Sequence, residues 1–373
     1  MTVILAAGWV SVLGSALSAG QAGPTEKPLM AEELFTNVRL LRGIPVDEFM
    51  DTMGMFAAAT GLNCTDCHVE ESGGSWARYA DDNPLKERAR TMVVMVNTLN
   101  RTHFEGRRVV TCYSCHNGRR RPQVNPSLAA QYAVDPIIVD PYEILQSPPG
   151  APTVDAVLDR YIQAVGGAAR LAGVTSFTAQ GTYGGFDDFA AYPLEIFASA
   201  PGLRTTILHS QYGDQTTTYD GRSGWIAAPM AVKPLPVMQL TGDNLEGLGV
   251  EAELAFPGRI KQVLGEWIVG PFAVIADRDV RMVQGRKPGG SPITLYFDEE
   301  SGLLTRLVRY SDSPVGRVPT QIDYEDYRDV SGIQMPFKWT STWTDGRTVF
   351  ELSSVQPNAR IDLARFAKPM PPT

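Results

Sequence analysis

The chain has 373 residues, of which 43% are hydrophobic and 20% are charged, and its formal net charge is -8. This length predicts two domains, and the composition is that of a globular protein with a substantial core. The acidic balance argues against nucleic acid as a partner.

The first residues carry the pattern of a secretory signal. An apolar run from Val3 to Leu17 is followed by small residues, and the run is short for a membrane span. We therefore expect residues 1–23 to be a signal peptide that is cleaved near Ala19–Ala22. Because no Lys or Arg precedes Lys27, an uncleaved anchor is the alternative. The protein is accordingly expected to be periplasmic or otherwise exported, with membrane association left open.

All four cysteines of the chain fall into two copies of one pattern, C-x-x-C-H. The copies are Cys64, Cys67 and His68, and Cys112, Cys115 and His116. Two thiols on one helical turn can each add to a vinyl group of the same porphyrin, and the adjacent imidazole can then ligate its iron. The pattern therefore predicts two covalently attached haem c groups.

Other uses of paired cysteines explain the pattern less well. A thioredoxin-like dithiol, a zinc site or two disulfides would each be compatible with two C-x-x-C pairs in a chain of this kind. None of them accounts for the histidine that directly follows each pair. The chain has only four histidines, and two of them occupy these positions.

A sixth iron ligand is sought upstream of each motif, where methionine would favour Fe(II). Before the first motif, Val46–Thr60 reads as an amphipathic helix that begins after Pro45, ends at Gly61 and carries Met53. Its predicted apolar face consists of Val46, Phe49, Met50, Met53, Phe56, Ala57 and Thr60.

The second motif has a similar prelude. Asn83 and Pro84 predict the start of a helix whose apolar stripe, at helical spacing, includes Met92. Met53 and Met92 are therefore candidate axial ligands, although a methionine on an apolar face is usually core filler. His103, expected in a loop over 101–111, is the alternative ligand. His209 is expected to lie in a strand.

The stretch from about Leu40 to Arg121 resembles the cytochrome c subunit family of bacterial photosynthetic reaction centres. The similar segments are GIPVDEFMDTMGMFAAATGLNCTDCH (Gly43–His68), ERARTMVVMVNTLN (Glu87–Asn100) and VVTCYSCHNG (Val109–Gly118). The repeat of that family is a helix with an axial methionine, a turn and C-x-x-C-H. The resemblance covers about a quarter of the chain.

The resemblance implies that Met53 and Met92 take the axial positions, with His68 and His116 on the proximal side. Reaction-centre members of the family carry four haems, whereas this chain has motifs for two, so it resembles a two-haem relative. The family also holds one haem with a histidine from another repeat, which keeps His103 as a candidate. Redox proteins are the expected partners, either a membrane-bound reaction centre or a respiratory complex.

The second half of the chain has a different pattern. A linker rich in proline is expected over Arg119–Pro152 and a helix over Thr153–Ala172; alternating apolar residues then predict antiparallel strands. The candidate strands are Ser176–Tyr183, Leu194–Ala198, Arg204–His209, Thr216–Asp220, Trp225–Ala227, Ile293–Asp298, Leu303–Tyr310, Thr320–Tyr327 and Val349–Ser354. With YDGRSGW (Tyr219–Trp225) and FDEESGLLTRLVRY (Phe297–Tyr310), this half resembles the LolA/LolB-like lipoprotein-carrier half-barrel.

The sequence thus predicts an α+β protein with two domains: a mainly helical multihaem cytochrome c module over 24–118, the linker 119–152, and an antiparallel β half-barrel with a helix over 153–373. The expected function is single-electron transfer and not catalysis. Two alternatives stay open: a peroxidase-like haem enzyme with one open iron, and a lipid or lipoprotein carrier that holds an apolar ligand in its C-terminal domain.

Overall fold

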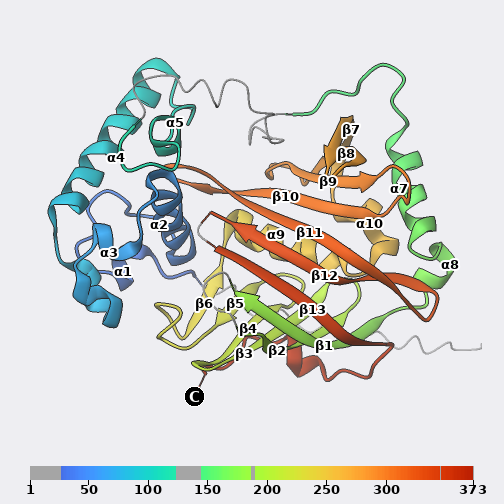
Figure 1. Ribbon diagram of the computed structural model, residues 1–373. Coiled ribbons are helices and arrows are strands. Elements are labelled where there is room, and N and C mark those ends of the chain that lie inside the picture. Colours follow the sequence, from blue (N-terminus) through green and yellow to red (C-terminus); the bar gives the residue numbers. More distant parts are fainter. Residues whose placement is uncertain (1–26, 123–143, 186–189, 345, 373) are drawn as a thin grey trace, which may run out of the picture.

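The computed structural model describes residues 27–122, 144–185, 190–344 and 346–372 (Figure 1). The predicted signal peptide and most of the predicted linker lie outside these residues. In Figure 1 the N-terminal helices form a module at one side of a large sheet, whose face is covered by later helices. The predicted α+β class, with a helical part followed by an antiparallel sheet, is confirmed.

Five α-helices and two 3₁₀ helices make up the N-terminal module. They are α1 (Ala31–Leu34), α2 (Val46–Thr60), α3 (Cys64–Cys67), η1 (Glu70–Gly74), η2 (Trp76–Ala80), α4 (Pro84–His103) and α5 (Cys112–His116).

The predicted start and end of α2 and the predicted start of α4 are confirmed. α2 follows Pro45 and ends at Gly61, which adopts the left-handed conformation at φ 66°. α4 begins after Asn83, whose side chain accepts hydrogen bonds from the backbone N–H groups of the first helical turn. The loop expected over 101–111 begins later, because α4 continues to His103 and ends at Phe104.

Thirteen strands from the described residues form one antiparallel sheet. Their bounds are β1 (Ser176–Gly185), β2 (Tyr192–Ser199), β3 (Leu203–Ser210), β4 (Gly213–Tyr219), β5 (Gly224–Ala227), β6 (Val237–Leu240), β7 (Gly265–Ile275), β8 (Arg278–Arg286), β9 (Ile293–Asp298), β10 (Leu304–Ser313), β11 (Gly316–Val330), β12 (Ile333–Trp343) and β13 (Gly346–Pro357). The order is β6-β5-β4-β3-β2-β1-β13-β12-β11-β10-β9-β8-β7. Pairing of β1 with β13 joins the two series of hairpins at the centre.

Every predicted strand is present, and four more were missed: β6, β7, β8 and β12. Strand β8 is buried along most of its length, so it lacks the polar alternation of a half-exposed strand. Strand β7 carries register shifts in its pairing with β8. Such irregular pairing interrupts the period-two pattern that identifies a strand in a sequence.

Helices cover one face of the sheet. They are α7 (Val154–Ala164), α8 (Ala168–Leu171), α9 (Gly242–Leu254) and α10 (Ile260–Val263), with the short turn η3 (Pro257–Arg259). A further short turn, η4 (Leu363–Phe366), contacts β3, where Thr205 donates to the Arg365 carbonyl. The single helix expected over Thr153–Ala172 is divided, because Gly166 and Gly167 between α7 and α8 have φ values of 127° and 83°. The main core lies between these helices and the sheet, and includes Leu158, Ile260 and Leu295.

The helical module packs directly on the sheet through α2. Val46 clusters with Met238 and Leu240 of β6, while Met55 and Ala59 cluster with Val315 and Val318, at the turn into β11 and on that strand. These apolar contacts fix the position of the helical module on the sheet (Figure 1).

Polar contacts join the same two parts. Asp51 accepts hydrogen bonds from Asn244 Nδ2 at 2.7 Å and Ser311 Oγ at 3.1 Å. Trp76 Nε1 donates to the Met230 carbonyl at 2.6 Å. Among the residues that the structure describes, no helix is both long and apolar enough to cross a bilayer.

Candidate functional site

Each C-x-x-C-H motif is a short helical turn whose N-terminus is stabilised by a capping box. Asn63 precedes Cys64, and its side chain accepts a hydrogen bond from the Asp66 N–H at 2.9 Å while the Asp66 carboxylate accepts from the Asn63 N–H. Thr111 and Ser114 form the same reciprocal pair before Cys112. These capping boxes hold the two cysteines of each motif three residues apart on one turn.

Both motif histidines are oriented by a backbone carbonyl. His68 Nδ1 lies 3.0 Å from the Tyr79 carbonyl oxygen, and His116 Nδ1 lies 2.9 Å from that of Arg119. A carbonyl only accepts, so each Nδ1 carries the proton and Nε2 carries the lone pair. This arrangement is the one that an imidazole ligand of a metal requires.

The four cysteines differ in their exposure to solvent. Cys64 and Cys115 are exposed, Cys67 is half-buried and Cys112 is buried. Burial raises the pKa of the Cys67 thiol, with the Asp66 carboxylate as the next cause, and burial also raises the pKa of Cys112. In each pair one thiol is therefore open to solvent and the other faces protein.

Helix α2 buries several residues outside the apolar stripe that the sequence predicted. The residues buried on it are Val46, Asp47, Thr52, Gly54, Met55 and Ala59. Apart from Val46, the predicted apolar face is only half-buried, and it includes Met53. Asp47 and Asp51 also face the rest of the protein, where they accept hydrogen bonds from Thr241 and Asn244 at the start of α9.

This division gives α2 two separate roles. Met55 packs with Cys112 and Val315, whereas Met53, two positions along the helix, lies outside that cluster. Residues two apart on a helix do not share a face. Met53 therefore points away from the cluster around Met55, on a half-buried part of α2.

Met92 on α4 is placed in a similar way. It is half-buried, whereas its neighbour Val93 is buried with Cys112 and Met55. Met95 is 42% exposed. Neither candidate methionine thus belongs to the buried cluster between α2, α4 and the second motif.

The other two histidines lie at the end of α4 and in the sheet. His103 is the last residue of α4 and is exposed. His209 lies in β3, as predicted, and its Nδ1 pairs with the Asp214 carboxylate at 2.8 Å.

The two motifs are brought together by their helices. α5 lies against α2, and the Gly118 N–H just after α5 donates to the Ala59 carbonyl at 3.0 Å (Figure 1). α3 and α5 both contact α4. The second motif therefore packs on the helix that precedes the first one, which places both in one compact unit.

Sequence reasoning missed the segment that supports His68. Tyr79 packs edge-on against the His68 ring at 4.9 Å between centroids and stacks with Trp76 at 5.3 Å. Two aromatic residues shortly after a C-x-x-C-H motif were the available signal. They cover one side of the first motif.

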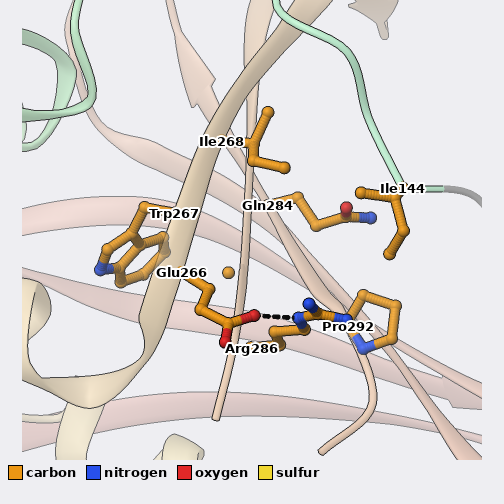
Figure 2. Close-up of a pocket in the computed structure, with 8 residues that line it drawn as sticks. Ile144, Glu266, Trp267, Ile268, Gln284, Arg286 and Pro292 are labelled. Carbon is orange, nitrogen blue, oxygen red and sulfur yellow. Dashed lines mark hydrogen bonds and ion pairs between the residues drawn. The ribbon is translucent and has the colours of Figure 1, made fainter. Parts of the chain in front are cut away.

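The C-terminal sheet contains a small cavity near the start of β7. Figure 2 shows residues that line it: Ile144, Glu266, Trp267, Ile268, Gln284, Arg286 and Pro292. Gly285 completes the lining. Its volume is about 200 Å³, below the range of roughly 300–1,000 Å³ typical of ligand pockets, and an ion pair joins Glu266 to Arg286. Within the described parts of the chain, no group of three or more His, Cys, Asp or Glu side chains is placed to hold a metal ion.

The fold and the two capped turns define a class: a helical module with paired C-x-x-C-H sites, seated on a large antiparallel sheet. Residues 15–130 match the family model described as photosynthetic reaction centre cytochrome C subunit. A curated relative, the photosynthetic reaction center cytochrome c subunit of Thermochromatium tepidum, is 35% identical over 100 residues, which are 25% of this chain and 23% of that protein. The similarity thus spans less than a quarter of the relative's length.

Solved structures are similar over the C-terminal part. A LolA superfamily protein from Nitrosomonas europaea has 14% identity and a TM-score of 0.39, and covers 58% of this chain and 99% of its own. A lipoprotein-sorting protein domain from Vibrio parahaemolyticus has 11% identity and a TM-score of 0.39, and covers 57% and 96%.

Proposed function

We propose that this protein is an exported di-haem c-type cytochrome that transfers single electrons. The observation that carries the proposal is the pair of capped C-x-x-C-H turns in which both histidines hold Nδ1 on a backbone carbonyl. The similarity to the reaction-centre cytochrome c family over residues 15–130 supports it.

The residues present fit haem c by the chemistry of their donors. Cys64 and Cys67 would form the thioether bonds of one group, with His68 as its proximal ligand. Cys112, Cys115 and His116 would do the same for the second group.

Met53 and Met92 are the proposed axial ligands on the opposite sides. Both side chains are half-buried, and each lies on one of the two long helices that precede a motif. The haem supplies a reversible one-electron couple, and filled axial positions keep that couple from binding small molecules.

The chain's own side chains would then orient the histidines, exclude water and set the two potentials. The apolar helix faces limit solvent access, which is one of the means by which proteins adjust a haem potential. The electron acceptor or donor is proposed to be another redox protein, either a membrane-bound reaction centre or a respiratory complex.

Attachment is tested by intact mass and a pyridine haemochrome assay on protein matured in an exporting host. Two haems per chain are expected, and one each in the Cys64→Ala/Cys67→Ala and Cys112→Ala/Cys115→Ala variants. The His209→Ala variant, altered in β3, is the control and should keep both. A colourless parent protein, or a parent with one haem, would overturn the proposal.

A further inference from the structure

The segment after the first motif is held by a lysine that sequence reasoning did not single out. Lys86 lies in the first turn of α4, and its ammonium group donates hydrogen bonds to three successive carbonyl oxygens, of Tyr79 at 2.8 Å and of Ala80 and Asp81 at 3.0 Å each. Its side chain is 13% exposed. A cation that satisfies three carbonyls at once is a firm clamp on the end of η2.

One of those carbonyls is also the one that orients His68. The Tyr79 oxygen accepts from Lys86 Nζ at 2.8 Å and from His68 Nδ1 at 3.0 Å. The Lys86 ammonium group is thereby held close to the His68 ring, because both contact one carbonyl oxygen. Lys86 therefore acts on His68 through the shared carbonyl and through its charge.

We propose that Lys86 is a positioning residue that raises the reduction potential of the first haem relative to the same site without this cation. This rests on the proposed di-haem function. An imidazole that donates strongly from Nδ1 gains electron density and favours Fe(III). A second donor on the same carbonyl oxygen withdraws density from that oxygen, so His68 donates less strongly and Fe(II) is favoured. The nearby positive charge acts in the same direction.

The second motif provides the internal comparison. His116 Nδ1 donates to the Arg119 carbonyl, three residues after it, and Lys86 makes its contacts at the other motif. Removal of the Lys86 charge is therefore expected to act on one haem of the two.

The test is spectroelectrochemical titration of the mature protein with two haems. The Lys86→Met variant keeps the length of the side chain. One of its two midpoint potentials should fall, by more than any change seen in the control variant, and the other should stay at the parent value. Lys86→Arg should retain the parent potential because it keeps a cation and several donors. Lys261→Met, which removes a partly buried lysine that pairs with Asp155 and Asp159, is the matched control and should move neither potential.

A purely structural clamp would give a different result. If Lys86 only fixes the loop, its loss should loosen the bond between His68 and Tyr79, and the Nδ1 proton of His68 should exchange faster with solvent in NMR spectra. We expect that proton to exchange as slowly as in the parent, or more slowly, while the potential falls.

Two results would overturn the proposal: unchanged potentials in a variant that holds two haems, and a lowered potential accompanied by faster exchange. The first would leave the di-haem function intact, because haem content is measured on the same sample. If Lys86→Met does not fold, Lys86→Gln, which keeps one neutral donor, is expected to lower the same potential, and failure to do so counts equally against the proposal.

Discussion

Asp47, in the first turn of α2, accepts hydrogen bonds from both the backbone N–H and the hydroxyl of Thr241, at 2.7 and 3.0 Å. The two residues are 194 positions apart, and Asp47 is 2% exposed. Burial raises the pKa of Asp47, and the hydrogen bonds from Thr241 oppose that effect. This pair therefore ties the helical module to the sheet at a buried point.

The Asp47→Ala variant is expected to lose about 1–3 kcal/mol of unfolding free energy, because the Thr241 N–H would be left buried without its acceptor. Denaturant unfolding measures the loss, and the Thr241 amide should exchange faster with solvent. Glu71→Ala, which removes an exposed acid of η1, is the control and should change stability by less than about 0.5 kcal/mol. Equal stability of the two variants would show that Asp47 does not hold the module on the sheet.

Glu48, the next residue of α2, makes the stability of this contact between the helical module and the sheet depend on pH. Burial raises its pKa to about 7, with the carboxylates of Asp47, Asp312 and Asp243 as further causes. A carboxyl whose pKa is higher in the folded than in the unfolded state stabilises the fold when protonated. Its contribution is full below its ordinary value of 4.5 and is lost as the pH rises through about 7.

The Glu48→Gln variant, which mimics the protonated acid, should match the parent at about pH 4 and exceed its stability by about 1–2 kcal/mol at about pH 8, after allowance for the partial exposure of the side chain. The measurement is chemical unfolding across this pH range. Glu33→Gln, in α1, controls for a general loss of negative charge. A stability difference that does not change with pH would contradict the assignment.

The sequence predicted the parts of the site that depend on local rules. The bounds of α2 follow from Pro45 and Gly61, and the two motifs are recognisable from their spacing alone. What escaped prediction depends on contacts between distant segments. No local pattern indicates that Asp47 at the start of α2 meets Thr241, which lies 194 positions further along the chain.

The helices and strands of the second half show the same limit. Repeated hairpins with alternating residues were predictable, whereas β8, buried along most of its length, was not. The role of Lys86 was equally hidden, because a lysine in the first turn of a helix normally faces solvent. Only the fold brings its ammonium group to the carbonyls of η2.

Two methionines of α2 offer a matched test of ligand against core residue. Met53 is half-buried, whereas Met55 is 7% exposed and packs with Cys112 and Val315. Met53→Ala should abolish the charge-transfer band that reports methionine bound to Fe(III) in one haem, with a small change in the stability of the polypeptide. Met55→Ala should keep that band and lose about 2–4 kcal/mol, because it leaves a cavity in the interface.

The optical spectrum of the oxidised protein and its denaturant midpoint distinguish these outcomes. Met92→Ala should remove the corresponding signal of the other haem. Loss of the band in Met55→Ala but not in Met53→Ala would transfer the ligand role to Met55. High-spin features in the parent would instead favour the open-iron enzyme.

The turn between α2 and the first motif depends on the absence of a side chain at Gly61. Its φ is 66°, and a Cβ there would lie 2.5 Å from the Gly118 carbonyl oxygen, where the second motif packs on α2. Gly106, which follows α4, serves as the control. Its φ is 79°, and a Cβ there would have no atom within 4 Å, so its substitution measures the cost of the backbone conformation alone. Gly106→Ala should therefore destabilise the protein by about 1 kcal/mol, and Gly61→Ala by a further ~1–3 kcal/mol, because the two motifs must move apart. Denaturant unfolding of the two variants measures the difference, and equal losses would mean that the close approach of Gly61 to Gly118 does not exist in solution.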